Sequence, residues 1–228
     1  MSADGSDTEQ HFKLAVAGSE VSARLALPAN ARACYVLAHG AGAGMLHPFM
    51  STAARELAAL GIATLRYQFP YMERRARRPD PPPLCHATVR AAVAAASARA
   101  PAVPLIAGGR SFGGRMTSQA QALAPLPGVR GLAFLGFPLH PAGKPGDGRA
   151  EHLFQVQLPL LFLQGSRDAL AERPLLESLI GRLGSRATLV LADEADHSFH
   201  VPAKSGTSDA ALRAGLWQAL SAWCATLT

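Results

Sequence analysis

The sequence predicts an α/β fold in which a mostly parallel sheet carries helices on both faces. Short apolar runs alternate with helical segments along most of the chain, as right-handed β-α-β crossovers require. The chain has 228 residues, 49% of them hydrophobic, and can therefore bury one full core. No linker or internal repeat divides residues 11–228, which we expect to form a single domain after a flexible N-terminus at residues 1–10.

The order of the expected elements begins with an antiparallel hairpin, because strand-like runs at 12–16 and 21–27 flank a turn at Gly18-Ser19. Further strands are predicted at 33–38, 62–69, 103–107, 132–137, 158–164 and 187–192. Helices are predicted at about 49–60, at about 84–98, from the end of the Gly-rich segment after 107 to about 122, at 175–183 and at 210–227. The irregular stretch at 140–155 is long enough for a flap but too short for a separate cap domain.

Residues 109–113, Gly-Arg-Ser-Phe-Gly, are the strongest chemical signal in the chain. They lie between a predicted strand and a predicted helix, which is the setting of a nucleophile elbow. A serine on such a sharp turn has a strained backbone, so its flanking positions need residues without side chains, here Gly109 and Gly113. Ser111 is therefore the predicted nucleophile, although the same pattern also arises by chance in Gly-rich loops.

A serine hydroxyl needs a base, and the base needs an acid that orients it. Asp168 and His197 each follow a predicted strand, in the chain order that accompanies this serine motif. Asp193 and Asp196 are rival acids, but they share the loop of the histidine and reach its far ring nitrogen less easily. We therefore expect His197 to be the base and Asp168 the acid.

A glycine-rich loop at residues 39–44 follows the strand predicted at 33–38. Together with the N–H of Phe112, the N–H of Ala41 in this loop is expected to form an oxyanion hole. A phosphate-binding loop is the alternative, but the Lys-Ser/Thr ending of a P-loop and the G-x-G-x-x-G pattern are both absent. Side chains near strand ends are expected to bind the substrate, namely Met45, Tyr71, Leu139, His140 and Phe199.

The net charge of +6 comes mainly from arginine, with one dense cluster at residues 74–78. No aromatic residue interleaves this cluster, and the chain has no helix-turn-helix or zinc-finger spacing. We interpret the cluster as a solvated basic loop, with an anion or partner contact as the alternative. No nucleic-acid partner is expected.

Three cysteines without metal-ligand spacing predict neither a metal site nor a cofactor. The acidic residues and histidines at 193–200 belong to one irregular loop and lack a second set of ligands. The N-terminus has no signal-peptide layout, and no apolar run reaches the roughly 18 residues of a membrane span. We expect a cytoplasmic protein without a membrane contact; the sequence does not fix its oligomeric state.

Taken together, these residues resemble the α/β-hydrolase superfamily from about residue 33 to residue 228. The layout without a cap is similar to the dienelactone-hydrolase-like branch, which often carries cysteine where this chain has Ser111. Runs at 37–45, 47–50, 69–73, 108–115 and 136–141 are similar to a bacterial subgroup related to the hydrolase-like domain of a chromatin-regulatory (non-specific lethal) complex subunit and to its testis-expressed relative. The resemblance implies the α/β-hydrolase fold and a Ser-Asp-His triad, but no known substrate.

Two functions are compatible with this sequence. The first is a serine hydrolase that cleaves an ester, thioester or related acyl bond of a small molecule through an acyl-enzyme intermediate. The second is a non-catalytic protein-interaction domain on a hydrolase fold. The complete set of Ser111, His197 and Asp168 favours the enzyme, because a degenerate site would be expected to lose at least one of them.

Overall fold

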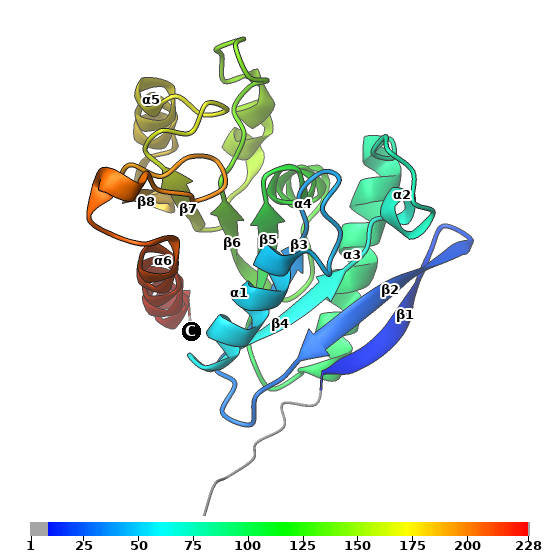
Figure 1. Cartoon of the computed structure of the whole chain (residues 1–228). Coiled ribbons are helices and arrows are strands. Elements are labelled where there is room, and N and C mark those ends of the chain that lie inside the picture. The colour runs from blue at the N-terminus through cyan, green and yellow to red at the C-terminus, as the bar shows by residue number, and fades with distance from the viewer. Residues whose placement is uncertain (1–8, 228) are drawn as a thin grey trace, which may run out of the picture.

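The centre of the molecule is an eight-stranded sheet with the order β1-β2-β4-β3-β5-β6-β7-β8 (Figure 1). A computed structural model describes residues 9–227; residues 1–8 of the segment predicted to be flexible lie outside the described residues. The strands are β1 (Gln10–Val16), β2 (Ser19–Ala26), β3 (Ala33–Ala38), β4 (Ile62–Tyr67), β5 (Leu105–Arg110), β6 (Val129–Leu135), β7 (Leu160–Gly165) and β8 (Ala187–Ala192). From β4 to β8 neighbouring strands are parallel, whereas β2 runs antiparallel to both β1 and β4. The predicted fold class is confirmed.

The hairpin turns one residue earlier than the sequence predicts. Val16 pairs with Ser19, so the turn consists of Ala17 and Gly18 rather than Gly18 and Ser19. Both turn residues have positive φ, 46° for Ala17 and 81° for Gly18. Two-residue hairpins favour such turns because their twist matches that of the strands. Alanine is a poor signal for this conformation, which explains the error.

Helices cover both faces of the sheet, as predicted (Figure 1). The helices α3 (Pro82–Arg99), α4 (Phe112–Leu123) and α5 (Arg173–Leu183) pack on one face, and α1 (Pro48–Ala58) and α6 (Asp209–Cys224) pack on the other. Side chains of β3 alternate between the two cores, Cys34 and Val36 in one and Tyr35 and Leu37 in the other. No helix within residues 9–227 is long and apolar enough to cross a membrane.

Two short helices lie where the sequence predicts irregular loops. The helix α2 (Pro70–Glu73) is held by the carboxylate of Asp80, which accepts hydrogen bonds from the N–H of Tyr71 and from Arg74, each at 2.6 Å. A 3-10 helix (Gly148–Gln155) lies within the predicted flap and packs against α4. Both are too short to show a hydrophobic period, so a pattern search misses them.

The strand β5 runs three residues beyond its predicted end at residue 107, because two glycines continue it. Gly108 pairs with Ala133 of β6, and Gly109 pairs with Ala38 of β3. A Cβ atom at residue 108 would lie 1.8 Å from the carbonyl oxygen of Ala133. These glycines let β5 approach its neighbours closely right up to the point where the chain turns.

We expect the substitution Gly108→Ala to reduce the free energy of unfolding by more than about 4 kcal/mol, because the added methyl group can be accommodated only by parting β5 from β6. Gly215→Ala is the matched control: residue 215 is exposed in the middle of α6, and nothing lies within 4 Å of its added Cβ. The control should stabilise the protein by about 0.5–1 kcal/mol, since alanine favours helix. Urea unfolding measures both, and a Gly108→Ala protein within about 1 kcal/mol of wild type would contradict the packing argument.

Candidate active site

Ser111 occupies the sharp turn between β5 and α4. Its φ of 49° and ψ of −114° are unusual for a residue with a side chain and mark local strain. The turn packs against the end of β3, where a Cβ at Gly109 would lie 2.3 Å from the carbonyl oxygen of Ala38 and one at Gly113 2.5 Å from that of His39. The two glycines of the motif are therefore required by a close backbone contact, and the serine projects from the carboxyl end of β5.

A chain of two hydrogen bonds joins the three residues predicted to act together. His197 Nε2 lies 2.9 Å from Ser111 Oγ, and His197 Nδ1 lies 2.6 Å from Asp168 Oδ2. With a carboxylate at Nδ1, that nitrogen carries the proton and Nε2 is free to accept the hydroxyl proton. The side chain of Asp168 is fully buried, whereas that of His197 is 24% exposed. The arrangement can therefore move a proton at a solvent-accessible serine.

The loops after β7 and β8 bring Asp168 and His197 together. The N–H of Arg167 donates to the carbonyl oxygen of Ala195 at 2.9 Å, which joins the two loops. A Cβ at Gly165 would lie 2.4 Å from the same oxygen, so the contact depends on this glycine. Because β7 and β8 are neighbours in the sheet and run parallel, the loops that follow them lie side by side. Asp168 in the first loop and His197 in the second can therefore come into contact.

The rival acids instead hold their own loop. Asp196 Oδ1 accepts hydrogen bonds from the backbone N–H groups of Ser198 and His200 at 2.7 and 2.9 Å. Asp193 accepts a hydrogen bond from the hydroxyl of Ser166 at 3.3 Å. The structure gives the histidine contact to Asp168 and leaves these two carboxylates as loop supports.

Gln164 is a residue of the site that sequence reasoning did not identify. It is fully buried at the end of β7, where its Nε2 donates to Asp168 Oδ2 at 2.5 Å and its Oε1 accepts from the N–H of Phe137 at 2.8 Å. The N–H of Leu170 donates to the other carboxylate oxygen of Asp168 at 2.8 Å. A polar residue ending an apolar strand was the available signal, since buried polar groups need partners.

The two predicted oxyanion donors lie on either side of Ser111. Phe112 is the first residue of α4, so its N–H has no acceptor within the helix. Ala41 follows Gly40, where an added Cβ would lie 4.0 Å from Ser111 Cβ. Among the hydrogen bonds of residues 9–227, neither the N–H of Ala41 nor that of Phe112 donates to another group. Both donors are thus available to a ligand.

The loop that carries Ala41 is fixed by two buried side chains. Tyr71 Oη accepts a hydrogen bond from the N–H of Gly42 at 3.0 Å. His39 Nε2 accepts from the N–H of Phe69 at 3.1 Å, and its Nδ1 lies 2.8 Å from the carbonyl oxygen of Gly40. Burial lowers the pKa of His39 to about 4, so the ring is neutral and can accept and donate in this way.

Two hollows meet at Ser111. The first has a volume of about 520 Å³ and is lined by His47, Phe49, Arg110, His197 and Ser198. The second has a volume of about 460 Å³ and is lined by Pro79, Phe112, Arg115, Met116, Pro138 and Arg149. Ala41, Ser111 and Leu170 line both. A bound molecule can therefore extend from the serine in two directions.

The five residues predicted to bind substrate lie behind these walls. Met45, Tyr71, Leu139, His140 and Phe199 line neither hollow, and the most exposed of them, Met45, has an exposed fraction of 5%. Phe199, for example, stacks on Phe49, which does face the first hollow. Sequence position identifies the ends of strands but not the direction of each side chain, so the sequence predicts neighbours of the lining residues rather than the lining residues themselves.

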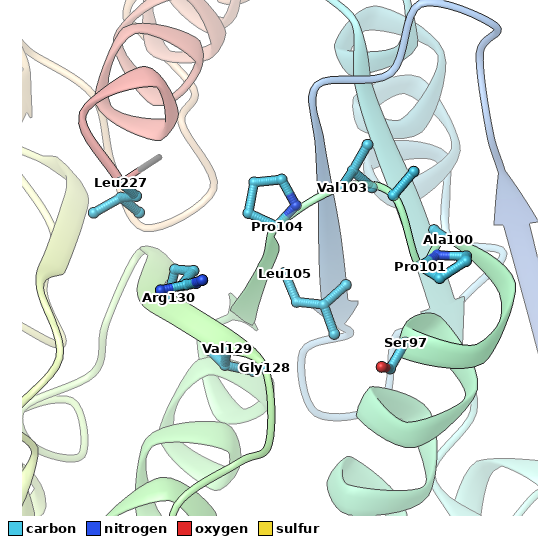
Figure 2. Close-up of a pocket in the computed structure, with 11 residues that line it drawn as sticks. Ser97, Ala100, Pro101, Val103, Pro104, Leu105, Gly128, Val129, Arg130 and Leu227 are labelled. Atoms are coloured by element: carbon cyan, nitrogen blue, oxygen red, sulfur yellow. The ribbon is translucent and has the colours of Figure 1, made fainter.

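A hollow larger than either of these lies elsewhere. It has a volume of about 630 Å³ and lies at the amino ends of β5 and β6 (Figure 2). Its lining includes Ala100, Pro104, Val129 and Leu227. Parallel sheets place their chemistry at the carboxyl ends of the strands, which is the end that carries Ser111. Size alone is therefore a poor guide to the site.

The fold is that of a known family. The chain belongs to the α/β hydrolase domain family, whose sequence pattern matches residues 31–225. Solved structures with the same fold include a lidless α/β serine hydrolase of Xanthomonas campestris, with a TM-score of 0.73, 22% identity and 94% of each chain covered. A dienelactone hydrolase of Anabaena variabilis has a TM-score of 0.75 and 20% identity, over 96% of this chain and 98% of that one.

A third similar structure is a cold-adapted esterase from an Arctic intertidal metagenomic library. Its TM-score is 0.68 and its identity 20%, over 97% of this chain and 99% of that one. Identities this low establish a shared fold and leave the chemistry to be argued from the residues of this chain.

We expect Gln164→Leu to reduce the free energy of unfolding by about 2–4 kcal/mol, because it leaves the buried Asp168 carboxylate and the N–H of Phe137 each short of a partner. Gln218→Leu is the matched control, since residue 218 is exposed on α6; it should change stability by no more than about 0.5 kcal/mol. Equal stabilities of the two variants in urea would show that Gln164 does not support the carboxylate.

Proposed function

We propose that this chain is a serine hydrolase that cleaves an ester, thioester or related acyl bond of a small molecule. The observation that carries the proposal is the hydrogen-bonded series from Ser111 through His197 to Asp168, at the carboxyl ends of three strands of the sheet. Family membership and the hydrolase and esterase structures of the same fold support it. No metal ion or organic cofactor enters the proposed reaction.

In the first half of the reaction Ser111 Oγ attacks the acyl carbon while His197 Nε2 takes the hydroxyl proton. Negative charge develops on the carbonyl oxygen, which accepts hydrogen bonds from the N–H groups of Ala41 and Phe112. The positive end of α4 faces the same oxygen. The bond to the leaving group then breaks, His197 gives that group its proton, and the acyl group remains on Ser111.

In the second half, water attacks the acyl-enzyme. His197 takes a proton from the water, and the tetrahedral intermediate again forms at the two N–H groups. Its collapse breaks the bond to Ser111 Oγ, which regains a proton from His197 and releases the acid. Throughout, Asp168 holds the ring in one orientation and stabilises the imidazolium, while Gln164 and the N–H of Leu170 hold the carboxylate.

Several finer statements stay predictions. They are the cytoplasmic location, the absence of a nucleic-acid partner, the division into residues 1–10 and 11–228, and the resemblance to the subgroup of the chromatin-regulatory complex subunit. In the basic loop Arg74 forms an ion pair with Asp80, and the neighbouring arginines are exposed. A protein-interaction domain without catalysis is the alternative that the first experiment below tests.

We expect a fluorophosphonate probe to label the wild-type protein and Ser111→Ala to abolish the labelling, because an activated serine displaces fluoride from the probe and becomes phosphonylated. Ser198→Ala is the control, since this hydroxyl lines the same hollow but is not bonded to His197. It should keep the labelling. Mass spectrometry of the labelled peptide identifies the residue. An unlabelled wild-type protein would favour the interaction domain, and persistent labelling of Ser111→Ala would show that Ser111 is not the nucleophile.

We expect Asp168→Asn to lower kcat on 4-nitrophenyl acetate by at least about 100-fold, because the amide no longer fixes the ring tautomer or balances the imidazolium charge. Asp193→Asn and Asp196→Asn are matched controls that remove the same charge from the histidine's loop, and each should cost less than about tenfold. Steady-state kinetics on the three purified proteins, with circular dichroism to check folding, measure this. Near-normal turnover of Asp168→Asn with collapse of either control would mean that the acid is misassigned.

A further inference from the structure

The second hollow at Ser111 carries two arginines that the proposed reaction does not use. Arg115 comes from the first turn of α4, and Arg149 from the 3-10 helix Gly148–Gln155. The guanidinium of Arg115 lies over the ring of Phe112, 5.9 Å from its centre, and Phe112 directly follows the serine. Two positive groups from separate elements thus face one small space next to the reacting atom.

The placement of Arg149 is built into the fold. His152, three residues further along the same 3-10 helix, forms a hydrogen bond of 2.8 Å with the hydroxyl of Ser118 on α4. Its ring also packs on Phe137, with ring centres 6.4 Å apart. These contacts fix the 3-10 helix against α4, the helix that bears Arg115. The two arginines therefore meet through packed structure rather than through a free loop.

Neither arginine has an acidic partner. No ion pair among residues 9–227 includes Arg115 or Arg149. The Nε of Arg115 is buried and has no hydrogen-bond partner within the described part of the chain. Asp80 lines the same hollow, but its two oxygens already accept from Arg74 and from the N–H of Tyr71. Within the described residues, the one carboxylate that lines this hollow is therefore paired with Arg74 and not with Arg115 or Arg149.

The neighbouring titratable groups respond to this charge. Burial lowers the pKa of Arg115, and the proximity of Arg149 lowers it further. Burial and then Arg115 lower the pKa of His152 to about 4, so this histidine is neutral at pH 7. The buried thiol of Cys85, also nearby, has its pKa raised to about 12 by burial and is neutral as well. Neither His152 nor Cys85 therefore adds a charge beside the pair.

The second hollow lies on the side of the serine that suits the acyl group. His197 must protonate the leaving group, so the leaving group occupies the first hollow, which His197 lines. The second hollow is not lined by His197 and extends from Ser111 past Phe112 to the arginines. The part of the substrate that stays on the serine is therefore the part that reaches the positive charges.

We propose that the acyl portion of the substrate carries an oxyanion, a second carboxylate, which Arg115 and Arg149 bind. The substrate class is then half-esters or half-thioesters of dicarboxylic acids. This proposal rests on the proposed hydrolase function, because it assigns the acyl side from the position of the catalytic histidine. Guanidinium groups match carboxylates with two parallel hydrogen bonds, and a carboxylate would give the buried Nε of Arg115 the partner that it lacks.

The test compares two esters that differ in one charge, 4-nitrophenyl hydrogen adipate and 4-nitrophenyl methyl adipate, with the corresponding suberates as a longer pair. We expect wild-type kcat/KM to favour the charged ester by at least about tenfold at one of the two lengths, as a charge-assisted hydrogen bond allows. Arg115→Gln and Arg149→Gln should each lower this ratio at least about fivefold. The test measures the ratio of kcat/KM for the charged ester to that for the methyl ester, because a general loss of packing would slow the hydrolysis of both esters alike.

Arg130→Gln is the matched control. Residue 130 is an exposed arginine at the opposite end of the sheet, so the substitution removes the same charge away from Ser111. It should leave the ratio within about twofold, because exposed charges at that distance are screened by salt. A wild-type ratio at or below one for both lengths, or equal ratios in wild type, Arg115→Gln and Arg149→Gln, would overturn the proposal.

A binding measurement separates this proposal from the hydrolase function. Adipate and suberate, titrated calorimetrically into the Ser111→Ala protein, should bind at least about tenfold more tightly than into the same protein with Arg149→Gln added. Their dimethyl esters should show no such difference. Failure of the serine chemistry would appear as a wild-type protein that resists the fluorophosphonate probe. Failure of the anion site would appear as binding of the diacids that ignores Arg149, whatever the probe result.

Discussion

The close contact between the elbow and the end of β3 is the constraint on which the rest of the site depends. Gly109 and Gly113 have no room for a Cβ against Ala38 and His39, and with two glycines the backbone of Ser111 is held at a positive φ. This contact projects the hydroxyl from the edge of the sheet and starts α4 at once, so that the N–H of Phe112 faces the same space. The same contact places the loop of Ala41 alongside. Strain at one residue is stabilised by packing over two strands.

The second requirement is a buried charge that remains a carboxylate. Burying Asp168 completely is costly unless its oxygens are paired. Gln164, the N–H of Leu170 and His197 together supply three hydrogen bonds, and each comes from a different segment at the ends of β7 and β8. The acid is thus rigid because the core holds it, whereas His197 stays partly open to solvent. A rigid acid and an accessible base suit a proton that must move in both directions.

Much of this arrangement could be predicted from the sequence, for identifiable reasons. The alternation of strands and helices, and the strand-turn-helix setting of residues 109–113, are local patterns, and parallel connections bring strand ends together. The residues that sequence reasoning missed depend on three-dimensional packing. Gln164 belongs to the site only because the turn after β7 brings the carboxylate of Asp168 within hydrogen-bond distance of its side-chain amide. Phe199 is buried behind the wall because it stacks on Phe49 of α1, and Met45 is buried as well. Ala17 adopts a turn conformation that its residue type does not signal.

The charge of the chain illustrates the same limit. The net charge of +6 favours no particular site when only the sequence is considered. In the structure many arginines are engaged: Arg213 pairs with Glu56, and Arg90 donates to carbonyl groups at the end of α4. Arg115 and Arg149 are different, because they are partly buried and share a hollow whose carboxylate, that of Asp80, is already paired with Arg74. Partial burial weakens screening by solvent and salt, so two such charges act more strongly on a ligand than the exposed arginines of the basic loop. The fold therefore makes one side of Ser111, lined by two arginines, more positive than the other side, where Arg110 is the one arginine among the lining residues. That asymmetry would orient a charged substrate before any bond is broken.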